Sequence, residues 1–341
     1  MRILLVFILY FSMLSTSFSM ENVFYVLRDQ QQQALQALTM HKKIVNTVIF
    51  QAYVIDSKGN VSGDADKAVM AFGKANSIHL MPMVTNSKFD AALTHQFLAN
   101  SNARKLALDT LLASCKKNQF YGIQFDFEMV PLTDKKLLTE FYREAADLFH
   151  KNKFIVSFAI APTLKDDHFP TDYQKKLYTV WQGAYDFKKL GEISDFVTVM
   201  AYDQHGIGTI PGPVASLPWV DLVIKHALSL IPANKISLGV PTYSGLWYMS
   251  AIPHTTRITM HYNSLDYRTL QYIIKKLQPR IFWDDLNKIH FSFYDSAGLN
   301  KYIFIEDAAS LKAKRNLAIK YKLRGISVFR LGIEDPDIWN I

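Results

Sequence analysis

Residues 121–128 read Tyr-Gly-Ile-Gln-Phe-Asp-Phe-Glu, and their alternation divides the segment into two faces, as in a β-strand. The apolar side chains at positions 123, 125 and 127 suit packing against a layer of helices. The opposite face carries Gln124, Asp126 and Glu128. An amide and two carboxyl groups on a face directed into a protein interior cost free energy when they are unpaired, so such a face indicates a functional site.

Asp126 and Glu128 are two residues apart, which places their Cα atoms about 6.5–7 Å from each other on a strand. Two carboxyl groups that close, in a poorly solvated site, raise the pKa of at least one of them. A carboxyl group that stays protonated near neutral pH is the general acid that cleavage of a glycosidic bond requires. From spacing alone, a half-exposed strand with a solvated polar face remains an alternative.

Eight short β-rich runs alternate with helical patterns along the 341 residues. The clearest helix spans 134–150, with apolar residues at helical spacing. Eight βαβ units predict an α/β fold, a closed (β/α)8 TIM barrel, more than an open sheet. The expected strands are Val23–Leu27, Thr47–Ile55, Ile78–Thr85, Tyr121–Val130, Phe154–Ala161, Asp195–Tyr202, Lys235–Thr242 and Arg324–Leu331.

The spacing is broken once, between the seventh and eighth expected strands, where the gap is far longer than one crossover helix needs. This gap predicts a small insertion on the barrel rim at about 249–312, ending in the eighth barrel helix. Runs at 257–262 and 290–294 and a helical pattern at 267–276 lie within it. The rest of residues 20–341 is expected to form one domain.

The first residues predict an export signal. Arg2 precedes an almost unbroken apolar run from Ile3 to Leu14, and Ser17 and Ser19 fit a cleavage site before Met20. The run is too short to cross a bilayer, and nothing later resembles a spanning helix. We therefore expect residues 1–19 to be a signal peptide and the mature protein to be secreted or periplasmic. Cys115 is the single cysteine, which excludes an internal disulfide and predicts a packed apolar residue.

The net charge of +8 could suit an anionic partner, but Lys and Arg are scattered and predict only a solvated basic surface, so no nucleic-acid partner is expected. The ten histidines show no metal-binding spacing, so neither a metal nor a cofactor is expected. An aldolase-like barrel enzyme would need a glycine-rich phosphate loop late in the chain. Ser244-Gly245 is a weak match for that loop.

Several motifs together resemble family 18 of the glycoside hydrolases, the chitinase family. Residues 122–128 resemble its Asp-x-x-Asp-x-Asp-x-Glu signature on the fourth strand. The further segments follow in the order of the family and resemble most closely its bacterial spore-cortex, peptidoglycan-directed glucosaminidase branch. They are Ser157–Pro162, Gly183–Asp186, Met200–Asp203, Gly212–Ala215, Leu238–Tyr243 and Gly325–Gly332 with Glu334–Pro336.

The resemblance implies hydrolysis of β-1,4 linkages next to N-acetylglucosamine, with the acetamido group of the substrate as the nucleophile. It implies that Glu128 protonates the leaving oxygen, that Asp126 stabilises the acetamido N–H, and that Tyr202 donates to the acetamido carbonyl. It further implies that the remaining site residues bind substrate, namely Gln124, Asp203, Met200, Phe329 and Trp247. We expect a monomer acting on an N-acetylglucosamine polymer or oligomer.

Three positions depart from the family pattern. Tyr121 and Gln124 stand where the signature has aspartates, and Phe329 stands where a tryptophan usually lies under the scissile sugar. Phenylalanine is a smaller platform without an indole N–H, and Trp247 or Trp219 could compensate or could equally be packing residues. A lectin-like protein that keeps the fold without catalysis is the alternative function, although Glu128 weighs against it. Chitin, peptidoglycan and N-glycan cores all carry the required acetamido group, and endo and exo action stay open.

Overall fold

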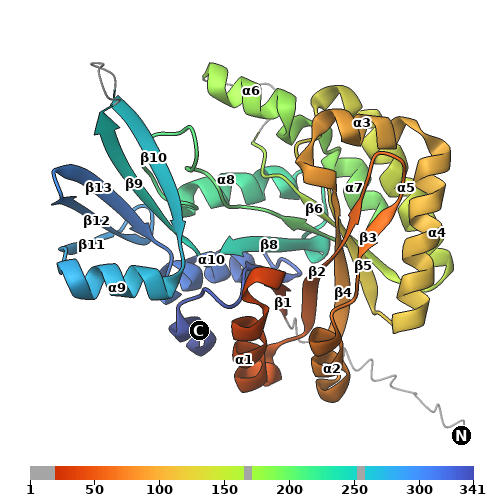
Figure 1. Ribbon diagram of the computed structural model, residues 1–341, viewed down its shortest axis with the longest axis horizontal. Coiled ribbons are helices and arrows are strands. Elements are labelled where there is room, and N and C mark those ends of the chain that lie inside the picture. Colours follow the sequence, from red (N-terminus) through yellow and green to blue (C-terminus); the bar gives the residue numbers. More distant parts are fainter. Residues whose placement is uncertain (1–19, 165–170, 252–257) are drawn as a thin grey trace, which may run out of the picture.

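The computed structural model describes residues 20–164, 171–251 and 258–341. Its main sheet is a barrel of eight parallel strands, closed because β1 pairs with both β2 and β14. The fold expected from the sequence is thus confirmed (Figure 1). A short strand, β3 (Val61–Gly63), pairs with the end of β2 in the antiparallel sense. The barrel strands are β1 (Glu21–Val26), β2 (Thr47–Ile55), β4 (His79–Asn86), β5 (Gly122–Asp126), β6 (Ile155–Ile160), β7 (Phe196–Val199), β8 (Ile236–Pro241) and β14 (Gly325–Phe329).

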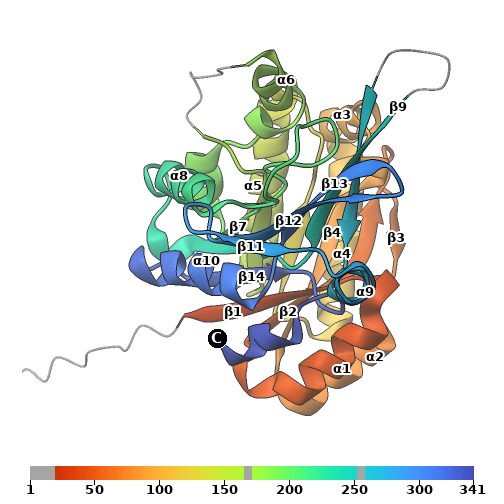
Figure 2. The same ribbon diagram turned by 90° about the vertical axis from the view of Figure 1, so that its left-hand side faces the viewer.

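Helices surround the barrel, as the view turned by 90° shows (Figure 2). Several begin at an acidic N-cap, whose side chain accepts bonds from otherwise unpaired N–H groups; Asp66 does so for α2 and Asp90 for α3. The helices are α1 (Gln31–His41), α2 (Lys67–Asn76), α3 (Ala91–Ala99), α4 (Ser101–Asn118), α5 (Lys135–Lys151), α6 (Asp172–Val180), α7 (Phe187–Ile193), α8 (Leu217–Leu228) and α10 (Ala308–Lys320).

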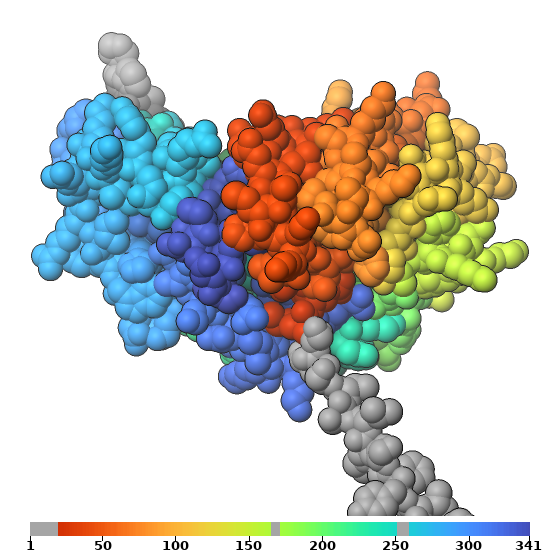
Figure 3. Space-filling model, turned by 90° about the horizontal axis from the view of Figure 1, so that it is seen from below, coloured from red at the N-terminus to blue at the C-terminus, as the bar shows by residue number. Residues whose placement is uncertain are grey.

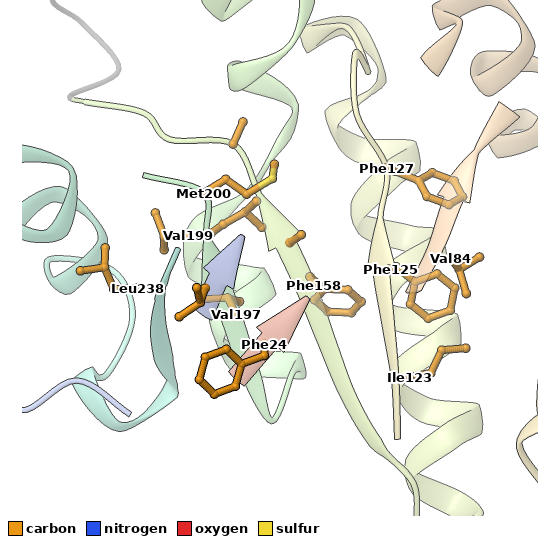
Figure 4. Packing of buried hydrophobic residues seen from close by; sticks show 14 of the residues in the cluster. Phe24, Val84, Ile123, Phe125, Phe127, Phe158, Val197, Val199, Met200 and Leu238 are labelled. Carbon is orange, nitrogen blue, oxygen red and sulfur yellow. The ribbon is translucent and has the colours of Figure 1, made fainter. Parts of the chain in front are cut away.

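The largest core fills the space between the barrel strands and these helices. In Figure 4, Ile123, Phe125 and Phe127 all lie on one side of β5, and each is fully buried. The rings of Phe125 and Phe127 pack against Phe141 of α5, with centroid distances of 5.5 and 5.3 Å. The outward face of β5 expected from its alternation is therefore confirmed. Cys115 is also buried, and burial raises the pKa of its thiol to about 12.

The barrel interior has an apolar half and a polar half. The apolar half is a separate cluster, formed by Val23, Tyr25, Ile49, Met81, Met83 and Phe196. The polar half is fully buried and is formed by Gln124, Ser157, Thr198, Ser237 and Ser327. Hydrogen bonds join its members across the barrel, including Ser237 to Ser327 at 2.7 Å and Thr198 to Ser327 at 3.2 Å. Small hydroxyl side chains thus replace the branched apolar residues that usually fill such a barrel.

A second sheet of five antiparallel strands is inserted between β8 and β14. The sheet begins at Ser244, five residues before the expected start of the insertion. It ends at Ile305, seven residues before the expected end, because the helix that follows, α10, belongs to the barrel. Its strands are β9 (Ser244–Ala251), β10 (Ile258–Leu265), β11 (Ile281–Asp284), β12 (Ile289–Ser296) and β13 (Leu299–Ile305), in the order β10-β9-β13-β12-β11. Helix α9 (Tyr267–Leu277) packs Leu270 against one face of this sheet.

Backbone hydrogen bonds tie the inserted sheet to the barrel at two places. The N–H of Tyr267 donates to the carbonyl of Ile333 at 2.8 Å, and the N–H of Leu217 donates to that of Asn287 at 3.1 Å. A third bond joins the two ends of the insertion, from the N–H of Glu306 to Oγ of Ser244 at 3.0 Å. These bonds give the sheet a defined position beside the carboxyl ends of β7 and β8.

The C-terminal segment packs against the first strand and the first helix of the barrel. The C-terminal segment lies beside the first helices in the view from below (Figure 3). There Trp339 stacks on Phe24 and His41, with centroid distances of 4.9 and 4.5 Å. Arg324 and Glu21 form an ion pair at 2.5 Å next to the pairing of β14 with β1. Among the described residues, no helix is long and apolar enough to span a membrane.

Candidate active site

The candidate site lies at the carboxyl ends of β5, β7, β8 and β14, where the strands of parallel barrels present their catalytic side chains. Asp126 is the last residue of β5, and Phe329 is the last of β14. Tyr202 and Asp203 follow β7, and Tyr243 follows β8. The expected strand 121–130 is therefore too long, because Glu128 lies two residues beyond the end of β5.

Asp126 is a buried carboxylate with an unpaired oxygen. The residue is 7% exposed, and its Oδ1 has no hydrogen-bond partner among the described residues. Burial raises its pKa to about 7, because ionisation in a poorly solvated place is unfavourable. An enclosed carboxylate oxygen without a partner is unusual in a folded protein, and it is able to accept a bond from a ligand N–H or O–H.

Glu128 is half-buried and faces two other carboxyl groups. Burial raises its pKa well above the usual range, and the negative charges of Asp126 and Asp203 raise it further. Glu128 is therefore the group held in the acid form when the neighbouring carboxylates are ionised. The preceding carbonyl, that of Phe127, accepts a hydrogen bond of 2.6 Å from the hydroxyl of Tyr185.

Tyr202 reaches the same place from β7. Its side chain is 7% exposed, and burial together with the nearby charges of Asp126 and Glu128 raises its pKa, so the hydroxyl stays protonated as a donor. Gly239 of β8 makes room for the ring, since a Cβ there would lie 3.1 Å from Cε1 of Tyr202 and 2.6 Å from the carbonyl of Val199. Met200 is buried directly after β7.

Asp203 adopts a left-handed backbone conformation, with φ of 59°. Its Oδ1 accepts a 2.5 Å hydrogen bond from the hydroxyl of Tyr243. The residue keeps access to solvent, yet the surrounding protein raises the pKa of its carboxyl, and the bond from Tyr243 offsets part of that rise. Asp203 lies near Glu128, since its charge raises the pKa of that residue.

Phe329 forms the centre of an aromatic box. Its ring stacks on Tyr202 at 5.4 Å with an interplanar angle of 18°, and it meets Tyr25 and Tyr243 edge-on at 5.5 and 6.5 Å. The ring is partly exposed, so one part can still contact a ligand. Three tyrosines therefore hold the smaller phenyl ring in place where the family usually has tryptophan.

Gln124 does not line a ligand site, which corrects its expected role in substrate binding. It is fully buried below Asp126, and its amide is used within the barrel. Its Oε1 accepts a bond of 2.6 Å from Tyr25, and its Nε2 donates to Ser157 at 2.9 Å and to Thr198 at 3.3 Å. Gln124 is thus the centre of the polar half of the barrel interior and supports the site from beneath.

Trp247 of β9 is fully buried against Tyr262 and Phe304, with centroid distances of 4.8 and 5.6 Å. Its ring offers no exposed face on which a sugar could stack. However, its Nε1 and the hydroxyl of Tyr262 are both enclosed without a partner among the described residues. Tyr262 lies over the loop that follows β7, since its ring approaches within 4.0 Å of the position a Cβ would take at Gly206.

Four polar side chains of the site were not predicted as functional from the sequence. Tyr25, Tyr185 and Tyr243 make hydrogen bonds within or directly beneath the site, and Asn86 bonds to the main chain of Glu128. They come from distant parts of the chain and form no local motif, although Tyr185 and Tyr243 lie in segments that resemble the family. Across the described ranges, no three His, Cys, Asp or Glu side chains are grouped so that they could hold a metal ion.

The closed (β/α)8 barrel thus carries two carboxyl groups, those of Asp126 and Glu128, at the carboxyl end of one strand, and tyrosine side chains surround them. Residues 21–334 match the sequence profile of Glycosyl hydrolases family 18. The chain belongs to this family and is a glycosidase of it.

Similar proteins include an uncharacterized glycosylase, cortex-lytic enzymes and chitinases. The chain is 28% identical over 309 residues to the uncharacterized glycosylase YvbX of Bacillus subtilis, covering 89% of this chain and 85% of that protein. It is 31% identical over 264 residues to the cortical fragment-lytic enzyme of B. subtilis, covering 76% of this chain and 58% of the enzyme. The chain therefore spans little more than half the length of that relative.

Two solved structures share the fold over 94% of this chain. The spore cortex-lytic enzyme SleL of Bacillus megaterium superposes with a TM-score of 0.81 at 23% identity, and 72% of that chain is covered. A chitinase from Chromobacterium violaceum superposes with a TM-score of 0.82 at 23% identity, and 97% of that chain is covered. The solved structures show the fold, and the spore-cortex branch indicated by the motifs is supported by the sequence relatives.

Proposed function

We propose that this protein hydrolyses β-1,4 linkages next to N-acetylglucosamine, in chitin-type or peptidoglycan-type glycans, by substrate-assisted retaining catalysis. The observation that carries the proposal is the pairing of two carboxyl groups. Asp126 has an enclosed oxygen without a partner among the described residues, and the pKa of Glu128 is raised by burial and by the charges of Asp126 and Asp203. The relatives support the substrate class, since their names describe a chitinase and lytic enzymes of the spore cortex.

In the proposed reaction, the 2-acetamido oxygen of the bound sugar attacks the anomeric carbon while Glu128 donates its proton to the leaving oxygen. The unpaired Oδ1 of Asp126 accepts the acetamido N–H and stabilises the positive charge of the oxazolinium ion. Tyr202 donates its hydroxyl to the acetamido oxygen. Glu128 is now ionised and takes a proton from the water that attacks the anomeric carbon. This attack opens the oxazolinium ring, and the β configuration is retained.

The test begins with purified glycans. The protein is incubated with N-acetylglucosamine oligomers and, separately, with peptidoglycan, and the products are identified by mass. We expect cleavage by the wild type and a loss of at least ~10²–10⁴-fold in Glu128→Gln, because the isosteric amide cannot donate an acidic proton. Glu192→Gln is the matched control, since Glu192 is an exposed glutamate of α7.

The stereochemistry provides the stricter criterion. NMR spectra taken early in the reaction are expected to show the β-anomer as the first product, and oligomers with a free amine in place of the acetamido group are expected to stay intact. An initial α-anomer would exclude the mechanism. Full activity of Glu128→Gln would remove Glu128 from the reaction altogether.

A further inference from the structure

Glu128 lies outside the sheet that holds its neighbours. The last residue pair between β4 and β5 joins Thr85 to Asp126, so the ladder ends before Phe127 and Glu128. Met129 then turns the chain away with a φ of 54°. Backbone N–H and C=O groups removed from the ladder need other partners in a buried place. The position of the Glu128 carboxyl group therefore depends on whatever replaces the ladder there.

The side chain of Asn86 replaces it. Asn86 is the last residue of β4 and is 3% exposed. Its Nδ2 donates to the carbonyl of Glu128 at 2.8 Å, and its Oδ1 accepts the N–H of the same residue at 2.9 Å. The primary amide thus makes the reciprocal pair of bonds that a peptide group would make in a sheet, and it binds both main-chain polar groups of one residue.

Helix α3 fixes the orientation of this amide. The Nδ2 of Asn86 also donates to Oγ1 of Thr94 at 2.8 Å, and Thr94 donates its own hydroxyl proton to the carbonyl of Asp90 at 2.7 Å. Because the hydroxyl proton of Thr94 is used in the bond to Asp90, Thr94 can only accept a hydrogen bond from Asn86. The amide atom of Asn86 that faces Thr94 is therefore the nitrogen Nδ2. Thr94 is 2% exposed, so solvent does not compete for these bonds.

We propose that Asn86 is a positioning residue for the reaction at this site, acting through the main chain of Glu128. The inference rests on the proposed function and adds a requirement to it. Asparagine alone supplies a donor and an acceptor at this reach: aspartate loses the donor, and alanine loses both. The hydroxyl of Tyr185 also donates to the carbonyl of Phe127 at 2.6 Å. Both residues that precede the turn at Met129 thus have main-chain groups bound by a side chain, Phe127 by Tyr185 and Glu128 by Asn86.

The kinetic test uses Asn86→Ala and Asn86→Asp, with Asn102→Asp as the control because Asn102 is exposed at the start of α4. We expect kcat to fall about 10–100-fold in both variants with KM changed less than about threefold, since a displacement near 1 Å costs about that much. In Asn86→Asp, the added negative charge next to Glu128 is expected to move the alkaline limb of the pH–rate profile to higher pH. A role in folding alone would lower the melting temperature and leave the kcat of the folded variants unchanged.

A crystal structure of Asn86→Ala separates this inference from the proposed function, because it needs no substrate. We expect Glu128 to be displaced or to occupy more than one conformation. An unmoved Glu128 overturns the inference even if the protein cleaves glycans as proposed. Conversely, a displaced Glu128 in a protein that cleaves no acetamido glycan supports the positioning and overturns the proposed function. Full kcat in a folded Asn86→Ala variant also overturns the inference.

Discussion

Asp126 destabilises the fold in which it acts. Its pKa in the folded protein is raised from 3.8 to about 7, so between those values the folded state binds more protons than the unfolded state. The stability that depends on this group is therefore fully present below about pH 4 and is lost as the pH rises through about 7. A carboxyl group kept in such a place is a local conflict of the kind found at functional sites.

Asp126→Asn tests whether ionisation of this buried carboxyl group lowers the stability of the fold. The amide cannot ionise, so we expect the free energy of unfolding of the variant to exceed that of the wild type by up to about 4 kcal/mol above pH 7, and to match it near pH 4. Urea unfolding at pH 4 and pH 8 measures both differences. Asp109→Asn, at an exposed ion pair on α4, should show no such pH-dependent gain. An equal gain at both pH values would contradict the account.

The sequence predicted the arrangement of the site residues only in part. The alternation of residues 122–127 predicted which side chains face outward, because the period of a strand is fixed. It could not predict that the strand ends at Asp126, since the partner that replaces the ladder is Asn86, on another strand and 42 residues away. It also could not predict that the amide of Gln124 is engaged in hydrogen bonds to Tyr25, Ser157 and Thr198. These side chains come close to Gln124 only when the barrel closes.

At the scale of elements, the inserted sheet contributes Tyr262 to the edge of the site, beside the loop that follows β7. Trp247 and Tyr262 are direct neighbours across β9 and β10, and each has an enclosed polar atom without a partner among residues of the described chain. Burial raises the pKa of Tyr262, and the charge of Asp203 raises it further. The sequence predicted an insertion from the length of one gap but not its contribution, because β9 follows β8 almost without a break.

Tyr262→Phe is expected to raise KM for the glycan several-fold with little change in kcat. It removes a donor that has no partner among the described residues, and it leaves the ring packed on Trp247. Initial rates over a range of oligomer concentrations measure the split. Tyr272→Phe is the matched control, since that tyrosine is exposed on α9. A fall in kcat at constant KM would instead place the hydroxyl of Tyr262 in the chemical step.

At the scale of the molecule, we propose that the protein is exported and that residues 1–19 are removed. These residues lie outside the described part of the structure, and β1 begins at Glu21, so cleavage before Met20 would leave the first barrel strand complete. N-terminal sequencing of secreted material from a bacterial host is expected to begin at Met20. Phe7→Arg, which interrupts the apolar run, should keep the protein inside the cell. Secreted protein that begins at Met1 would contradict the prediction.

The closure of the barrel by β1 and β14 also has a consequence in time. Glu21 is paired with Gly325, so the first strand waits for one of its two neighbours until nearly the whole chain has left the ribosome. At 5–20 residues per second, that delay is roughly 15–60 s. Throughout it, the inner face of β1, with Val23 and Tyr25, has no closed interior to enter. Synthesis alone therefore delays the closure of the barrel, and the partly made chain exposes apolar surface until β14 has been added.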